Sequence, residues 1–153
     1  MHTDCPVRMR YDMSEILYKE VYPVAKDDFI RAGEASAKIK RVLKQLGVDA
    51  DKIRRTSVVS YECEINLIIH SMGGEMCLEV SPDQIVVTSK DIGPGIKDIS
   101  LAMKEGWSTA SDSIREMGFG AGMGLPNMKR HCDEFILDSE FGRGTTIIMK
   151  INL

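Results

Sequence analysis

A glycine-rich segment between Met117 and Phe135 constrains this chain more than any other. Alternate glycines let a backbone adopt positive φ and approach a ligand closely, because no Cβ stands in the way. The run that follows favours a helix, whose first turn offers unpaired N–H groups and the positive end of its dipole to a phosphate. The four glycines are Gly118, Gly120, Gly122 and Gly124. The segment is compatible with phosphate binding, but glycine-rich turns are common and most bind nothing.

The segment does not match either of two common phosphate-binding turns. No Gly-Lys-Ser/Thr closes it, as a P-loop requires. It also does not follow the first strand of a βαβ unit, as a Rossmann turn does. Its interpretation therefore depends on the rest of the chain.

Composition limits the class of protein. The chain has 153 residues, of which 43% are hydrophobic, a length that suits one domain with its own core. The formal net charge of -3, without a Lys/Arg run, argues against a nucleic-acid surface. No apolar stretch has the length of a membrane span, and no signal peptide is recognisable at the N-terminus.

The four cysteines are scattered and form no CxxC pair, which argues against zinc and against a disulfide framework. They are Cys5, Cys63, Cys77 and Cys132. Reduced thiols in a cytoplasmic protein are the expected state.

The spacing of apolar residues predicts an α+β fold, with helices covering one face of a mixed, mostly antiparallel sheet in a two-layer sandwich. Residues 1–14 are expected to be loosely ordered and 15–153 to form a single domain. The expected elements are a strand over 15–24, a helix over 29–46, a helix from 50 to the Gly73-Gly74 pair, strands over 76–81 and 84–90, a short helix over 97–104, a long loop over 106–121, a helix over 123–132, and strands over 134–140 and 145–152.

Helix ends are assigned from capping residues. Asp27 or Asp28 is the expected N-cap of the first helix and Gly47 its stop, whereas Asp49 is the expected N-cap of the second helix. The residues expected to point inward from the second helix are Ile53, Ser57, Tyr61, Ile65 and Ile69.

A polar stripe runs along the second helix. Glu62, Asn66 and His70 are each four residues apart, a spacing that places them on nearly one face. Taken alone, such a stripe is usually a solvated helix surface. Its position before an Asp-x-Gly-x-Gly turn, the glycine segment and a final Gly-Thr-Thr changes that interpretation.

Four motifs in this order resemble the boxes of the Bergerat-fold (GHKL) ATPases, the superfamily of gyrase, Hsp90, histidine kinases and mismatch-repair ATPases. Within it, the chain is most similar to the anti-sigma-factor serine/threonine kinases and switch kinases of bacteria. The resemblance covers roughly residues 15–152. The four segments that carry it are Glu62-xxx-Asn66-xxx-His70, Asp91-Ile92-Gly93-Pro94-Gly95-Ile96, Gly118 to Pro126, and Gly144-Thr145-Thr146.

The resemblance implies an ATP/ADP site with Mg²⁺. The Asp91 carboxylate is expected to accept from the adenine amino group, while Gly93, Gly95 and Ile96 let the turn pass under the base. An ordinary turn explains an Asp-Gly sequence equally well in isolation. Thr145 and Thr146 are expected to form the floor of the base pocket, although β-propensity also explains a Gly-Thr-Thr strand start.

The catalytic end of the site is expected on the second helix. Asn66 offers a neutral oxygen ligand for Mg²⁺. Glu62 is placed by the resemblance as the carboxylate that orients or deprotonates an attacking serine or threonine hydroxyl. For His70, lining the nucleotide site and simple helix-end packing are both open.

The phosphates are expected under the glycine segment. The resemblance implies that Gly118, Gly120, Gly122 and Gly124 close over them, with backbone N–H groups through Met123 and Leu125 as donors. Ser108 and Thr109 resemble a hydroxyl pair that touches the phosphates or caps a turn.

The implied function is transfer of the ATP γ-phosphate to a serine or threonine of a small STAS-type anti-anti-sigma protein, by a cytoplasmic anti-sigma regulatory kinase. The alternative is a nucleotide-gated anti-sigma factor that binds its partner without significant kinase activity. A sigma factor and a phosphatase are further partners that the resemblance suggests. A homodimer is also compatible with the resemblance. Neither nucleic acid nor a membrane is expected as a partner.

Overall fold

The computed structural model describes residues 16–96, 98–104 and 124–153. Its elements follow the predicted order along the chain. They are β1 (Tyr18–Val24), α1 (Glu34–Gln45), α2 (Ala50–His70), β2 (Gly74–Val80), β3 (Gln84–Asp91), α3 (Ile99–Ala102), α5 (Gly124–His131), β4 (Glu134–Glu140) and β5 (Gly144–Asn152). The loop predicted over 106–121 lies outside the described residues.

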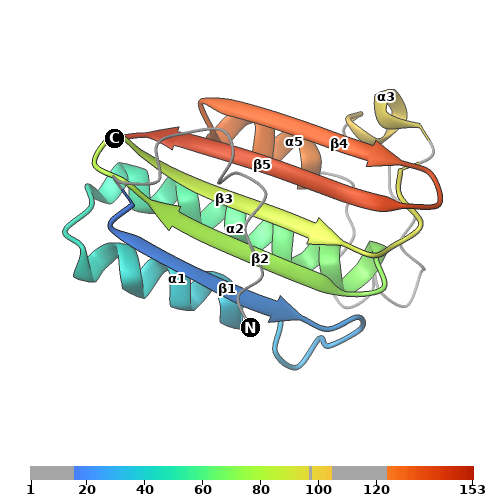
Figure 1. The fold of residues 1–153 in the computed structure, drawn as a ribbon, viewed down its shortest axis with the longest axis horizontal. Coiled ribbons are helices and arrows are strands. Elements are labelled where there is room, and N and C mark those ends of the chain that lie inside the picture. Colours follow the sequence, from blue (N-terminus) through green and yellow to red (C-terminus); the bar gives the residue numbers. More distant parts are fainter. Residues whose placement is uncertain (1–15, 97, 105–123) are drawn as a thin grey trace.

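The five strands form one sheet in the order β1-β2-β3-β5-β4. Helices α1, α2 and α5 lie together on one face of it (Figure 1). The predicted α+β class is therefore confirmed. The predicted mixture of strand directions is corrected, because every pairing between described strands is antiparallel.

Alternation along β5 separates the two faces of the sheet. Ile147, Met149 and Ile151 belong to the core under the helices, whereas Ile148 belongs to a separate cluster with Cys77 and Val86. Successive side chains of a strand point to opposite faces, so this division fixes which residues of β5 reach the helix side.

Helix α1 begins later than predicted. Its N-cap is Gly33, not Asp27 or Asp28, and no side chain of the cap residue bonds to the helix. Instead the buried Glu64 of α2 accepts hydrogen bonds from the backbone N–H groups of Ala35 at 3.1 Å and Ser36 at 3.0 Å. A carboxylate supplied from another helix thus satisfies the open first turn.

Helix α2 begins as predicted, with the Asp49 side chain accepting from the Asp51 N–H at 3.2 Å. Its inward face is rotated from the predicted one. Cys63 and Leu67 are essentially buried, and Tyr61, predicted inward, is 40% exposed. Of the predicted set, Ile53 and Ile65 are buried, while Ser57 and Ile69 are half-buried.

Three further features complete the fold: the short helix α3, the cysteines and the lengths of the helices. The short helix spans Ile99–Ala102 and is capped by Asp98, which accepts from the Leu101 N–H at 3.1 Å. None of the described cysteines, Cys63, Cys77 and Cys132, forms a disulfide. Within the described ranges, no helix is long and apolar enough to cross a membrane.

Candidate nucleotide site

Two predicted residues lie together beneath the start of α5. A Cβ on Gly124 would stand 3.2 Å from the Asn66 Oδ1 and 3.2 Å from the Glu62 Oε2. The first turn of α5 therefore sits directly over these two side chains of α2. The Asn66 carboxamide makes no hydrogen bond to any other described residue, so its oxygen is available to a ligand.

Asn127, one turn further along α5, contacts the same carboxylate. Its Nδ2 donates to the Glu62 Oε1 at 3.5 Å, at the long limit of a hydrogen bond. Burial raises the pKa of Glu62, and the Asn127 contact and the nearby His131 oppose that rise. A carboxylate in this environment is a better proton acceptor than one in water.

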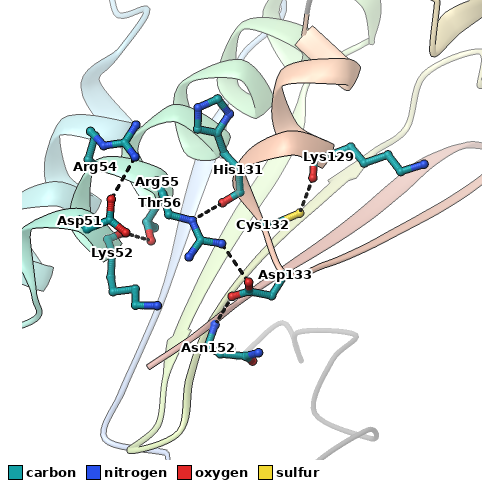
Figure 2. Close-up of polar contacts among 10 residues, drawn as sticks. All are labelled: Asp51, Lys52, Arg54, Arg55, Thr56, Lys129, His131, Cys132, Asp133 and Asn152. Carbon is teal, nitrogen blue, oxygen red and sulfur yellow. Dashed lines mark hydrogen bonds and ion pairs between the residues drawn. The ribbon is translucent and has the colours of Figure 1, made fainter.

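Arg55 of α2 fixes the far end of α5. Its Nε donates to the His131 carbonyl oxygen at 3.0 Å, and its guanidinium lies 3.1 Å from the Asp133 carboxylate (Figure 2). The other oxygen of Asp133 accepts from the Asn152 N–H at 2.7 Å. These contacts tie α2, α5 and the ends of β4 and β5 together, which fixes the position of Asn127 over Glu62.

A second cluster of predicted residues surrounds Asp91, at the end of β3. The Asp91 Oδ1 accepts from the Gly93 N–H and from the Thr145 N–H, both at 2.9 Å. This bond to Thr145 joins the turn to the start of β5. Among the described residues, no donor reaches the Asp91 Oδ2, which leaves one carboxylate oxygen open to a ligand.

The turn after Asp91 packs tightly against the β4–β5 hairpin. Gly95 has a φ of 76°, and a Cβ there would overlap the Glu140 carbonyl oxygen. The Ile96 N–H donates to the Ser139 Oγ at 2.7 Å, and Ser139 bonds in turn to the Thr145 hydroxyl at 2.8 Å. Gly95, Ile96 and Thr145 are thus held together by contacts with the β4–β5 hairpin.

The end of α2 joins the two clusters. A Cβ on Gly93 would stand 2.9 Å from the Ser71 Cα, so the Asp91 turn abuts the residue after His70. Ser71 follows Glu62 by nine positions, a rise of roughly 13 Å along a helix at 1.5 Å per residue. Glu62 therefore lies near the middle of α2, Asn66 lies one turn later, and the C-terminal end of the same helix contacts the Asp91 turn.

The structure also places the remaining predicted residues. Thr146 follows Thr145 in β5, so its side chain points to the sheet face away from the helices. Leu125 is buried at the start of α5, where it belongs to the core. The predicted residues outside the described ranges are Ser108, Thr109, Gly118, Gly120, Gly122 and Met123.

Sequence reasoning missed two residues that contact the predicted site residues: Asn127 and Ser139. Asn127 carries the clearest signal, because it is half-buried in a helix turn whose other residues, Leu125, Pro126 and Met128, are buried. A polar side chain among apolar neighbours indicates a specific partner. Ser139 has no comparable signal, since serine is common near strand ends.

The comparisons agree with this geometry. Residues 38–153 match the family model described as Histidine kinase-, DNA gyrase B-, and HSP90-like ATPase. The chain belongs to this ATPase family. The predicted superfamily is therefore confirmed, and with it an ATP-binding fold.

Two relatives narrow the class within the family. The chain is 35% identical over 113 residues to the serine/threonine-protein kinase RsbT of Bacillus subtilis (strain 168), covering 71% of this chain and 78% of RsbT. It is 30% identical over 122 residues to an anti-sigma F factor of Geobacillus stearothermophilus, covering 76% of this chain and 80% of that protein. These matches confirm the predicted similarity to switch kinases and anti-sigma factors.

A solved structure shows the same fold. The SiaB–SiaC complex from Pseudomonas aeruginosa contains a chain that aligns with a TM-score of 0.61 at 13% identity, covering 95% of both chains. At this identity the match supports the fold alone.

We expect the Gly144→Ala variant to lose stability and nucleotide affinity together. Gly144 has a φ of 105°, and a Cβ there would stand 2.7 Å from the Asp91 carbonyl oxygen and 2.9 Å from its Oδ1. Backbone strain of this kind costs about 1–3 kcal/mol, and the clash with Asp91 adds to it. Denaturant unfolding and calorimetric titration with ATP measure the two effects.

Gly142→Ala is the matched control. Gly142 also has positive φ, 92°, but a Cβ there meets nothing within 4 Å. We expect the free energy of unfolding of this variant to fall only by the cost of the backbone strain, and its affinity for ATP to stay unchanged. Equal losses of unfolding free energy and of ATP affinity in the two variants would show that the packing of residue 144 against Asp91 contributes to neither quantity.

We expect His70 to make the protein less stable in mild acid. Burial lowers the pKa of His70, so the unfolded chain takes up a proton at this side chain at a higher pH than the folded chain does. The free energy of unfolding should then fall as the pH drops below about 6.5, by at most about 1.4 kcal/mol per pH unit. His70→Gln should flatten this slope in denaturant unfolding between pH 7 and pH 5. An unchanged slope would show that His70 does not cause the loss of stability in mild acid.

Proposed function

We propose that this protein is an ATP-dependent serine/threonine protein kinase that phosphorylates a small anti-anti-sigma partner of the STAS type. The observation that carries the proposal is the pairing of Glu62 and Asn66 under the first turn of α5. The family supports ATP binding, and the similarity to RsbT and to anti-sigma F factors supports a protein kinase.

The nucleotide would lie along α2. Its adenine end fits the Asp91 turn, where the open Oδ2 is placed to accept from an amino group while Oδ1 holds Gly93 and Thr145. Its phosphate end fits Gly124, because the absence of a side chain there lets α5 approach Asn66 and Glu62 closely. The N-terminal turn of α5 adds N–H donors toward the same point.

The donor set fits Mg²⁺ better than a transition metal. The described residues include no group of three or more His, Cys, Asp or Glu side chains that could hold a metal ion. Mg²⁺ needs few protein ligands, and the Asn66 carboxamide, which bonds to no other residue of the described ranges, would supply a neutral oxygen for it. When bound, Mg²⁺ neutralises charge on the phosphates of ATP.

Glu62 would handle the proton of the acceptor hydroxyl. Burial raises its pKa, which makes the carboxylate a better proton acceptor, and the hydrogen bond from Asn127 orients it. The hydroxyl oxygen attacks the γ-phosphorus as its proton passes to Glu62, and the bond to the ADP oxygen breaks in line with the attack. Positioning of the two reactants supplies most of the remaining rate enhancement.

The partner is inferred from the relatives. Anti-sigma F factors are named for a sigma factor, and we propose that this chain too regulates a sigma factor in the cytoplasm, by phosphorylating an anti-anti-sigma protein. A phosphatase that reverses the phosphorylation and a homodimer of the kinase would complete such a switch. The alternative function is a nucleotide-gated binding protein, which needs the Asp91 turn but not Glu62 as a base.

Calorimetric titration with ATP and ADP, with and without Mg²⁺, tests the nucleotide site. We expect both nucleotides to bind, and we expect Mg²⁺ to strengthen ATP binding in the wild type but much less in Asn66→Ala. Asn66 makes no hydrogen bond to a described residue, so this variant should keep its thermal stability. If neither nucleotide bound the folded wild type, the proposed function would be wrong.

A further inference from the structure

A groove of about 580 Å³ lies between α1 and α2, and Glu62 forms part of its wall. Lys40 and Lys44 of α1 and Arg54 of α2 also line it. The groove runs from the proposed catalytic carboxylate toward the N-terminal half of α2. Anything that brings a hydroxyl to Glu62 along this path would place its neighbouring residues in the groove.

The charge of the groove is opposite to that of the whole chain. The chain carries a formal net charge of -3, yet three cations line this groove. Lys40 and Lys44 are exposed and have no ion-pair partner among the described residues, whereas Lys38 on the same helix lies 3.4 Å from Glu34. Arg54 is paired with Asp51 at 3.0 Å. Lys40 and Lys44, one turn apart on α1, thus present two ammonium groups that no described carboxylate pairs, and these can attract an anionic segment.

The lining also offers apolar surface. Tyr61 is 40% exposed, and its ring stands 3.6 Å from the position of a Cβ on Gly33. Val58 and Ile53 lie one and two turns before it along α2 and line the same groove. A half-exposed tyrosine beside aliphatic side chains and cations is the surface expected for an amphipathic peptide segment.

We propose that this groove binds an acidic, amphipathic segment of the phosphoacceptor protein, next to the serine or threonine that reaches Glu62. Acidic side chains of the segment pair with Lys40 and Lys44, and an apolar side chain packs on Tyr61. The inference rests on the proposed kinase function for the position of the hydroxyl. It adds a determinant of substrate choice that lies outside the nucleotide site.

Charge reversal in the groove tests the inference. The variant Lys40→Glu/Lys44→Glu is compared with Lys38→Glu/Arg41→Glu, which makes the same change of charge on exposed residues of the same helix outside the groove. Each is incubated with Mg-ATP radiolabelled on the γ-phosphate and a soluble extract of the host at several dilutions. At high dilution of the extract, we expect the groove variant to label the protein that the wild type labels about tenfold more slowly than the wild type does. The control variant should label it at a rate within about twofold of the wild-type rate.

Two further readouts separate docking from nucleotide binding. All three proteins should have the same affinity for ATP, and added salt should slow labelling by the wild type more than labelling by the groove variant. Equal labelling by the two double variants would overturn the inference while leaving the kinase function intact. If the wild type labelled nothing, the kinase function would fail instead.

A direct binding measurement tests whether the groove binds an acidic peptide, without any phosphoryl transfer. The probe is a short fluorescent peptide with one serine, two leucines and several glutamates, and its counterpart has lysines in place of the glutamates. Fluorescence anisotropy should show binding of the acidic peptide to the wild type and to the control, with at least about tenfold weaker binding to the groove variant. Equal binding of both peptides, or displacement of the acidic peptide by duplex DNA at lower concentration than by unlabelled peptide, would contradict a site for an acidic protein segment.

Discussion

Asp91→Asn is expected to fold normally and to bind ATP roughly 10- to 150-fold more weakly than the wild type, the range for one hydrogen bond to a charged group, about 1.5–3 kcal/mol. The asparagine oxygen can still accept from the Gly93 and Thr145 N–H groups, which keeps the turn in place. Its amide nitrogen would replace the open Oδ2 and face the adenine amino group, donor to donor. Calorimetric titration at constant salt measures the loss.

Base specificity gives a sharper readout. Adenine presents an amino donor where guanine presents a carbonyl acceptor, so the wild type should prefer ATP to GTP. In Asp91→Asn the preference should narrow or reverse, because the new amide nitrogen can donate to guanine. Asp91→Ala is the companion variant, and it should lose stability as well, since both N–H groups lose their acceptor. Unchanged ATP affinity in a folded Asp91→Asn would show that the base binds elsewhere.

Glu62→Gln is expected to lower the rate of phosphoryl transfer by about 10²- to 10⁴-fold, the usual contribution of a general base. The glutamine keeps the size of the side chain and can still contact Asn127, so ATP affinity should stay within about twofold. Initial rates of label transfer at saturating ATP measure the effect. A rate close to that of the wild type would mean that Glu62 only orients neighbouring groups.

The same variant should be more stable than the wild type at neutral pH. The pKa of Glu62 is raised in the folded protein, so folding favours its protonated form, and the ionised form is penalised above that pKa. Glutamine imitates the protonated form and carries no penalty. The difference in Tm should shrink as the pH falls through the range where the wild-type carboxyl becomes protonated. Glu75→Gln, on the sheet outside the site, is a control with the same chemical change.

Local signals predicted most of the fold. Asp49 caps α2 as expected, and the β2–β3 hairpin turns near Ser81, as the Ser-Pro-Asp sequence predicts. The start of α1 could not be predicted in this way, because its first turn is capped by Glu64 from another helix. Tertiary contacts of this kind leave no signal within the segment that they cap.

The candidate site likewise combines residues that local motifs indicate with contacts that depend on tertiary packing. Glu62, Asn66 and Asp91 are predicted site residues because the order and spacing of the motifs resemble those of the family. The contact between Asn127 and Glu62 depends on how α5 lies on α2, which the Arg55 contacts decide. Thr146 was predicted together with Thr145 from the resemblance of Gly144-Thr145-Thr146 to the last motif of the family, although neighbours in a strand face opposite ways.

The chemical nature of the phosphorylated product tests the central claim most directly. Wild-type protein is incubated with a soluble extract of the host and ATP radiolabelled on its γ-phosphate, with Mg²⁺, and Glu62→Gln is the control. We predict that one small protein is labelled by the wild type only, and that acid hydrolysis of it yields phosphoserine or phosphothreonine. No labelled protein, or an acid-labile phosphohistidine instead, would contradict the account of this protein as a serine/threonine kinase.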